Sequence, residues 1–131
     1  MTIAQDTIKK NQSLEDRLAA INARIAVLQK QADRVEWMMR LIPLIQSCVC
    51  KEYGLNSFAG LASAKFATAV EAKRVAVVLF QKHTDLSYPE IALVMGIPRT
   101  NHASIHGQHK AGLDRPEVLA AVARIEERLG L

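Results

Sequence analysis

The first third of the chain carries a regular spacing of apolar residues. Ser13, followed by Asp16 three positions later, is typical of a helix start. From Leu14 onward the intervals between apolar positions alternate four and three, the heptad repeat of a coiled coil. The pattern predicts a coiled-coil helix over residues 13–42, preceded by a disordered polar tail over residues 1–12. The repeat positions are Leu14, Leu18, Ile21, Ile25, Leu28, Ala32, Val35, Met39 and Ile42.

A stripe this long and narrow is better covered by a second helix than by a small domain. We therefore expect a homodimer through this helix. A helix packed on its own domain and a different partner protein are the alternatives. The residues expected to dimerise are Leu14, Leu18, Ile21, Ile25, Leu28, Val35 and Met39.

The remaining patterns predict a small helical domain over residues 43–131. Pro43 predicts a kink or break near Ile42, because proline removes a backbone donor and crowds the preceding turn. The next helix should run to about Tyr53, where Gly54 supplies a left-handed cap. Residues 55–64 read as a loop, and alanines and valines predict a helix over 68–83.

Residues 86–113 combine two short helices with a tight turn. Ser87 and Glu90 form an S-x-x-E capping box, and Gly96 ends the helix that they start. Thr100 is the expected N-cap of the following helix, which starts at Asn101. Such a pair is typical of a helix-turn-helix. An amphipathic helix over 116–129 closes the domain, and since no segment alternates as a strand does, the predicted fold is all-α.

Composition and charge place few limits on the partner. The 131 residues have a net charge of +4, which permits an anionic partner without requiring one. Cys48 and Cys50 are two apart, so they would point to different sides of a helix, which suits reduced thiols. The chain begins without a secretory signal and has no run long enough for a membrane span. We expect a cytoplasmic protein with no membrane partner.

Three of the four histidines, His102, His106 and His109, lie on one face of the predicted second helix. A metal site there would need further ligands, which the neighbouring sequence does not offer, so no cofactor is expected. The chain also lacks a phosphate-binding glycine loop, a nucleophile elbow and a paired-carboxylate site. We therefore do not expect an enzyme.

Double-stranded DNA fits the same segment better. Arg99, Asn101 and Ser104 near the helix N-terminus are residue types that pair with base edges in the major groove. Residues 61–110 hold six basic and three acidic residues, which concentrates positive charge around this helix. The basic residues are Lys65, Lys73, Arg74, Lys82, Arg99 and Lys110.

Three stretches, AKRVA (72–76), SYPEIA (87–92) and RTNHASI (99–105), resemble the C-terminal DNA-binding domain of the bacterial replication initiator DnaA. With flanking helices the likeness covers roughly residues 40–130. It implies a helix-turn-helix variant whose second helix enters the major groove. By this resemblance Lys65 would reach the minor groove and Lys73 matches a helix arginine. Bases would be read by Asn101, His102, Ala103 and Ser104, and Arg74, Ser87, Arg99, Thr100 and Lys110 complete the candidate DNA contacts.

The sequence also departs from that family. Asn101 replaces an aspartate, Ala103 replaces a threonine, and the turn before the helix is longer, so base recognition should differ. No Walker A loop is present, and the family's ATPase module is therefore missing. We expect a dimeric regulator of transcription or replication, with a possible protein partner in either process. A protein-only adaptor and a ligand-responsive regulator of the tryptophan-repressor type are the alternatives.

Overall fold

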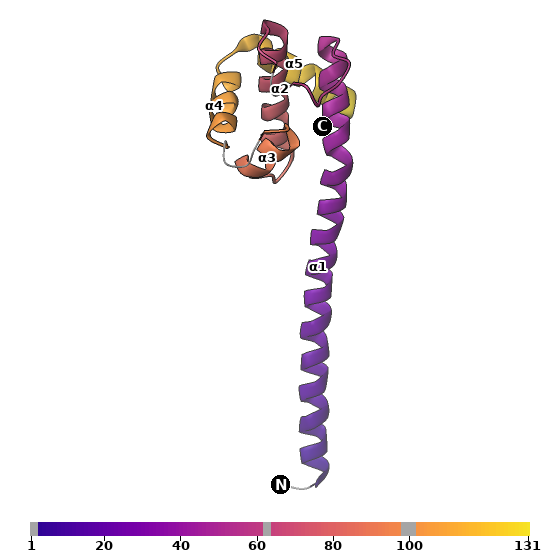
Figure 1. Ribbon diagram of the computed structural model, residues 1–131. Coiled ribbons are helices and arrows are strands. Elements are labelled where there is room, and N and C mark those ends of the chain that lie inside the picture. Colours follow the sequence, from indigo (N-terminus) through magenta and orange to yellow (C-terminus); the bar gives the residue numbers. More distant parts are fainter. Residues whose placement is uncertain (1–2, 62–63, 98–101) are drawn as a thin grey trace. The chain divides into compact units, whose positions relative to one another are not determined.

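The computed structural model describes residues 3–61, 64–97 and 102–131, and these form five α-helices without a strand (Figure 1). The all-α prediction is therefore confirmed for the described residues. No helix among them is both long and apolar enough to cross a membrane. The helices are α1 (Ile3–Tyr53), α2 (Ala67–His83), α3 (Tyr88–Val94), α4 (His102–Leu113) and α5 (Pro116–Leu129).

Helix α1 is longer than the sequence predicted. It begins at Ile3, so the prediction of a disordered tail is wrong for residues 3–12. These residues include good helix formers such as Gln5, Lys9 and Lys10, and Asp6 lies in the first turn, where an acidic side chain is favoured by the helix dipole. Residues with high helix propensity precede the first residue of the heptad repeat. The propensity of these residues, and not the repeat, therefore decides where α1 starts.

Of the predicted kink or break near Ile42, the break is wrong, because α1 continues through Pro43 to Tyr53. Proline removes one intrahelical hydrogen bond, which costs about 3 kcal/mol in a helix interior. Leu41 and Ile45, on either side of Pro43, are buried in the hydrophobic core. Their burial favours the helical conformation on both sides of the proline and offsets this cost.

Contacts divide the chain into two units, Met1–Met38 and Met39–Leu131. In the first unit no residue from 3 to 37 is buried. The predicted dimerisation residues in this unit are between 50 and 58% exposed, and Met39, at the start of the second unit, is also exposed. Apolar side chains at this exposure gain little from the hydrophobic effect within a single chain.

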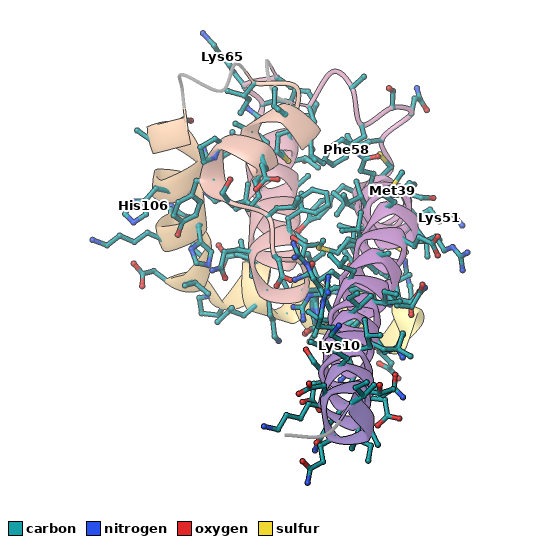
Figure 2. The ribbon with its side chains drawn as sticks, turned by 90° about the horizontal axis from the view of Figure 1, so that it is seen from below. Lys10, Met39, Lys51, Phe58, Lys65 and His106 are labelled. Carbon is teal, nitrogen blue, oxygen red and sulfur yellow. The ribbon has the colours of Figure 1, made fainter. Side chains whose placement is uncertain are left out.

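The core of the second unit is built around α2. Six consecutive residues, Val75 to Phe80, are at most 3% exposed. Because six residues span more than one helical turn, α2 is buried around its full circumference at this level. The rings of Phe80 and Phe58 meet edge to face with their centroids 6.4 Å apart. The loop after α1 therefore also contributes to the core, in agreement with the position of Phe58 in Figure 2.

Helix α3 starts at the predicted capping box. The amide of Ser87 donates to Oε1 of Glu90 at 3.0 Å, and the amide of Glu90 donates to Oγ of Ser87 at 3.4 Å. The helix ends before Gly96, whose φ of +78° is readily adopted only by glycine. The amide of Ile97 then donates to the carbonyl of Ala92 at 2.7 Å and closes the turn. Start and stop of α3 are both as predicted.

Helix α5 closes the domain between Pro116 and Leu129, as the sequence predicted. Its buried face consists of Val118, Ala121, Val122 and Ile125. Its polar face forms ion pairs with two other helices. Nε of Arg124 lies 2.6 Å from the carboxylate of Glu52 in α1, and Glu126 accepts from Lys82 and His83 of α2 at 2.7 and 2.6 Å.

Helices α2 and α4 lie close together at Gly112. A Cβ atom at this position would lie 2.9 Å from Cγ2 of Val78 and 3.4 Å from Cβ of Arg74. Only a residue without a side chain allows this spacing. Gly107, in the same helix, has open space where its Cβ would be.

Substituting these two glycines should therefore have opposite effects on stability. We expect Gly112→Ala to lower the free energy of unfolding by about 1–3 kcal/mol, because the added methyl group overpacks the contact with Val78. Gly107→Ala should raise it by roughly 0.5–1 kcal/mol, because alanine favours the helical state. Urea unfolding followed by circular dichroism measures both, and equal effects would contradict the close packing of α2 and α4.

Candidate nucleic-acid interface

Helices α3 and α4 form the pair that the sequence predicted as a helix-turn-helix. Both pack against α2, and they pack against each other. Ile91 and Met95 on one side of the turn and Ile105 on the other are buried in the common core. Since Ile105 and Gly112 fix one face of α4, the opposite face is free to contact a partner. Ala103, Ser104 and Lys110 are exposed on α4.

The beginning of the expected reading helix is only partly described. Helix α4 starts with His102. Arg99, Thr100 and Asn101, and with them the predicted N-cap, lie outside the described residues. Ala103 and Ser104 follow in the first turn of α4. The described part of α4 therefore starts directly after Asn101, the predicted first residue of this helix.

Tyr88, the first residue of α3, connects the two helices through two histidines of α4. The ring of His106 meets the tyrosine ring edge to face with centroids 5.3 Å apart. Nδ1 of His109 lies 3.1 Å from the tyrosine hydroxyl, which can donate a hydrogen bond to the neutral imidazole. His106 is exposed on the outer side of α4 (Figure 2), whereas His109 is half-buried. The contacts of Tyr88 with His106 and His109 were not predicted from the sequence, although an aromatic residue directly after Ser87 was a signal for them.

The environment of His109 disfavours its protonated form. Burial lowers the pKa of this histidine below its usual 6.5, and repulsion from His106 lowers it further. A charged imidazolium at this position would be partly desolvated and could no longer accept from Tyr88. His109 therefore supports the angle between α3 and α4 as a neutral side chain.

Lys73 holds the segment that leads into α2. Its ammonium group donates to the carbonyl of Ala64 at 2.6 Å. Burial and the nearby charge of Lys65 lower the pKa of Lys73. Lys73 is half-buried and already hydrogen-bonded, which makes it poorly suited to contact a phosphate. It instead holds the backbone next to the exposed Lys65.

Two other predicted contact residues also have partners within the domain. Nε of Arg74 donates to Oε1 of Gln108 at 3.3 Å and joins α2 to α4. The hydroxyl of Ser87 donates to the carboxylate of Glu90 at 2.8 Å within the capping box. These two side chains thus contribute to the position of α4 and α3, respectively. Of the basic residues counted in the sequence, Lys82 is likewise in an ion pair, with Glu126 at 2.7 Å.

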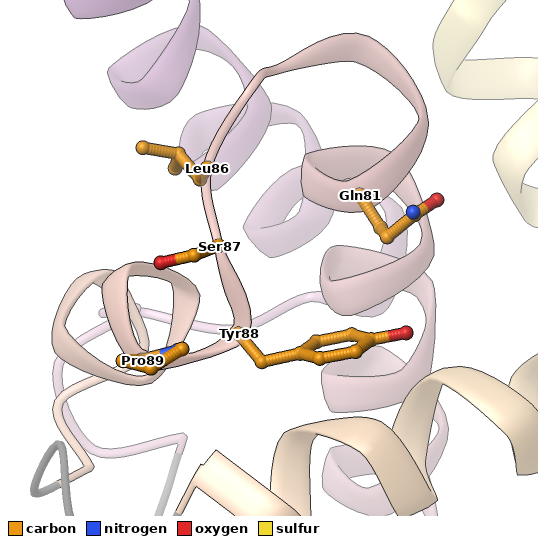
Figure 3. Close-up of a pocket in the computed structure, with 5 residues that line it drawn as sticks. All are labelled: Gln81, Leu86, Ser87, Tyr88 and Pro89. Atoms are coloured by element: carbon orange, nitrogen blue, oxygen red, sulfur yellow. The ribbon is translucent and has the colours of Figure 1, made fainter.

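A shallow hollow lies beside the start of α3. It has a volume of about 480 Å³ and is lined by Gln81, Leu86, Ser87, Tyr88 and Pro89. Figure 3 shows the side chains of Gln81 and Tyr88 extending to one side of the segment before α3, and that of Ser87 to the other. Among the described residues, none of those that line the hollow is charged.

Within the part of the chain that the structure describes, no group of three or more histidine, cysteine, aspartate or glutamate side chains is placed to hold a metal. His106 and His109 are instead in contact with Tyr88. The sequence matches no protein-family model and has no significant relative among the curated proteins. The resemblance to the DnaA domain therefore depends on the three short stretches of sequence alone.

The lowered pKa of His109 predicts a pH-dependent stability. His109 binds its proton more tightly in the unfolded chain than in the folded chain. The contribution of the neutral side chain to the free energy of unfolding is therefore complete above pH 6.5. It is lost as the pH falls through the lowered pKa of the folded state. We expect the free energy of unfolding to decrease from pH 8 to about pH 5.5, and His109→Gln to make the decrease smaller.

The matched control is His106→Gln, which removes the exposed histidine beside Tyr88 and keeps His109. It should retain most of the decrease, because burial, the larger cause of the lowered pKa of His109, remains. Urea unfolding at a series of pH values provides the comparison, and the contribution of the His83–Glu126 pair is common to all three proteins. An unchanged pH dependence in His109→Gln would contradict a neutral, partly buried His109.

Proposed function

We propose that this protein is a dimeric, sequence-specific double-stranded DNA-binding protein that regulates transcription or replication and reads the major groove with α4. The observation that carries the proposal is the α3–turn–α4 pair, in which one face of α4 is fixed by Ile105 and Gly112. The other face presents Ala103, Ser104 and Lys110 to the outside. A major groove about 12 Å wide admits one helix held in this manner.

The candidate residues fall into three roles. Asn101, His102 and Ser104 are the candidates for base contacts, since amide, imidazole and hydroxyl groups can bond to base edges. Lys65 and Lys110 are exposed cations suited to phosphates, which position a protein on DNA without reading its sequence. Lys73, Arg74 and Ser87 hold the backbone and helices in place through the hydrogen bonds described above.

The likeness of SYPEIA and RTNHASI to the DnaA motif supports this proposal, and so does the net positive charge between residues 61 and 110. No catalytic role is included in the proposal. A dimer would present two copies of α4 to two half-sites, about one turn of DNA apart.

Replacing Asn101 or His102 with alanine should reduce sequence preference. We expect the affinity for the preferred site to fall by about 1–3 kcal/mol for each good base contact that the substitution removes. Affinity for unrelated DNA should change little, because phosphate contacts remain. Selection of bound sites from random duplex DNA defines the preferred site, and titration of that site and of a scrambled site measures the effect.

Asn56→Ala is a matched control for Asn101→Ala, because Asn56 is exposed in the loop after α1. If the Asn101 and His102 variants select the same sites with the same affinity as the parent protein, α4 is not the reading helix. If the parent protein selects no site at all, the result favours the adaptor, which would bind protein only.

Lys65→Ala should act differently. Removal of one phosphate contact should weaken binding to every sequence and reduce the slope of log affinity against log salt by about one. Lys51, an exposed lysine at the end of α1, offers the matched control Lys51→Ala (Figure 2). Equal salt slopes for the Lys65 variant and the parent protein would remove Lys65 from the interface.

A further inference from the structure

The repeat that forms the exposed stripe of α1 continues upstream of the predicted helix start. Because α1 begins at Ile3, the four-three spacing can be followed back from Leu18 and Leu14 to Asn11. In heptad notation Asn11, Leu18, Ile25, Ala32 and Met39 occupy a positions, and Leu14, Ile21, Leu28 and Val35 occupy d positions. This set of nine residues is called the seam.

We propose that the seam pairs with the seam of a second copy of this chain, in parallel and in register. The proposal rests on the dimeric state included in the proposed function and adds the orientation of the two helices. Three observations carry it. The seam side chains are exposed in the single chain, the flanking charges are segregated, and Asn11 occupies a core position.

The charges that flank the seam are sorted by sign. Positions g, which precede each a residue, hold Lys10, Arg17, Arg24, Gln31 and Met38. Positions e, which follow each d residue, hold Glu15, Asn22, Gln29 and Glu36. All charged g residues in this set are thus basic and all charged e residues are acidic. Charges at these two positions decide partner and orientation in coiled coils.

In a parallel pair, each g residue faces the e residue of the following heptad in the partner. Lys10 then faces Glu15 of the second copy, twice by symmetry. Arg17 and Arg24 face the neutral Asn22 and Gln29, and Gln31 faces Glu36. The parallel arrangement therefore brings oppositely charged residues together in the Lys10–Glu15 pairs and places no two like charges opposite each other.

An antiparallel pair with full overlap brings g next to g and e next to e. With Leu18 level with Val35 of the partner, Glu15 would face Glu36 at both ends of the coil. Asn11 would lie level with the apolar Ile42. This arrangement replaces two attractive pairs with two repulsive ones and leaves a core asparagine without a polar partner.

Asn11 selects the same arrangement independently of charge. A single asparagine at an a position fixes register and favours two strands in parallel coiled coils, because the two amides can hydrogen-bond only when they lie at the same level. The adjoining core positions Ala4 and Thr7 add little apolar area, so the coil is held mainly from Leu14 onward. In a parallel coil the seams of both copies end together at Met39, where both domains begin.

Disulfide trapping distinguishes the two orientations. In a background with Cys48→Ala and Cys50→Ala, Leu18→Cys and Val35→Cys are made as separate proteins and oxidised without DNA. The parallel, in-register coil predicts that each variant alone forms a covalent dimer, because identical positions face each other. The antiparallel coil predicts covalent dimers only when the two variants are mixed, and this outcome would overturn the proposal.

Charge reversal tests the same arrangement without cysteine. Glu15→Lys should raise the dissociation constant of the dimer several-fold in a parallel coil, because the introduced lysine would then face Lys10 of the second copy. Addition of Lys10→Glu should restore the affinity. In the antiparallel coil Glu15→Lys would instead relieve the repulsion from Glu36 and tighten the dimer. Asp16→Lys, at an outer position two residues before Leu18, is the matched control and should change little.

Sedimentation equilibrium of the parent protein completes the test. A monomer at micromolar concentration, with no crosslink in either cysteine variant, would overturn the paired seam. Because these measurements contain no DNA, a trapped parallel dimer that selects no DNA site would contradict the DNA-binding proposal and leave the parallel coil intact.

Discussion

The domain depends on the burial of α2 around its full circumference. Val75 to Phe80 point in every direction from the helix axis, and each direction must be covered by apolar side chains from elsewhere. Helices α3, α4 and α5, the C-terminal part of α1 and the loop containing Phe58 provide this cover. Because α4 uses the face with Ile105 and Gly112 to cover α2, its opposite face remains exposed. The exposed face of α4 is a consequence of this arrangement.

The same requirement explains why α1 is one helix. Its large apolar residues upstream of Met38 are exposed, whereas Leu41, Ile45 and Val49 are buried in the core. The helix thus carries one apolar stripe that is exposed and a second that is buried in the core. Burial on both sides of Pro43 outweighs the loss of one hydrogen bond, so the proline lies within the helix. The seam and the core-facing stripe are therefore consecutive parts of a single helix.

Much of the charge that the sequence placed around α4 is used inside the domain. Lys73, Arg74 and Lys82 bond to Ala64, Gln108 and Glu126, respectively. The exposed lysines at 65 and 110 have the exposure that phosphate contacts require. Net charge along the sequence therefore overstated the number of cationic side chains available to the proposed DNA partner, because a count of residues does not record their contacts within the domain. The role of His109 was likewise not predictable from the sequence, because its contact with Tyr88 joins residues 21 positions apart.

Elements with local signals could be predicted directly from the amino-acid sequence. The capping box at Ser87 and Glu90, the left-handed glycines at 54 and 96, and the helix from Pro116 to Leu129 all depend on neighbours within a few residues. The all-α class followed from the same patterns. Three features emerged only from tertiary packing: the continuity of α1 through Pro43, the close approach at Gly112 and the contacts of Tyr88 with α4. These depend on the free energy of burying side chains that are distant in sequence, which no local pattern contains.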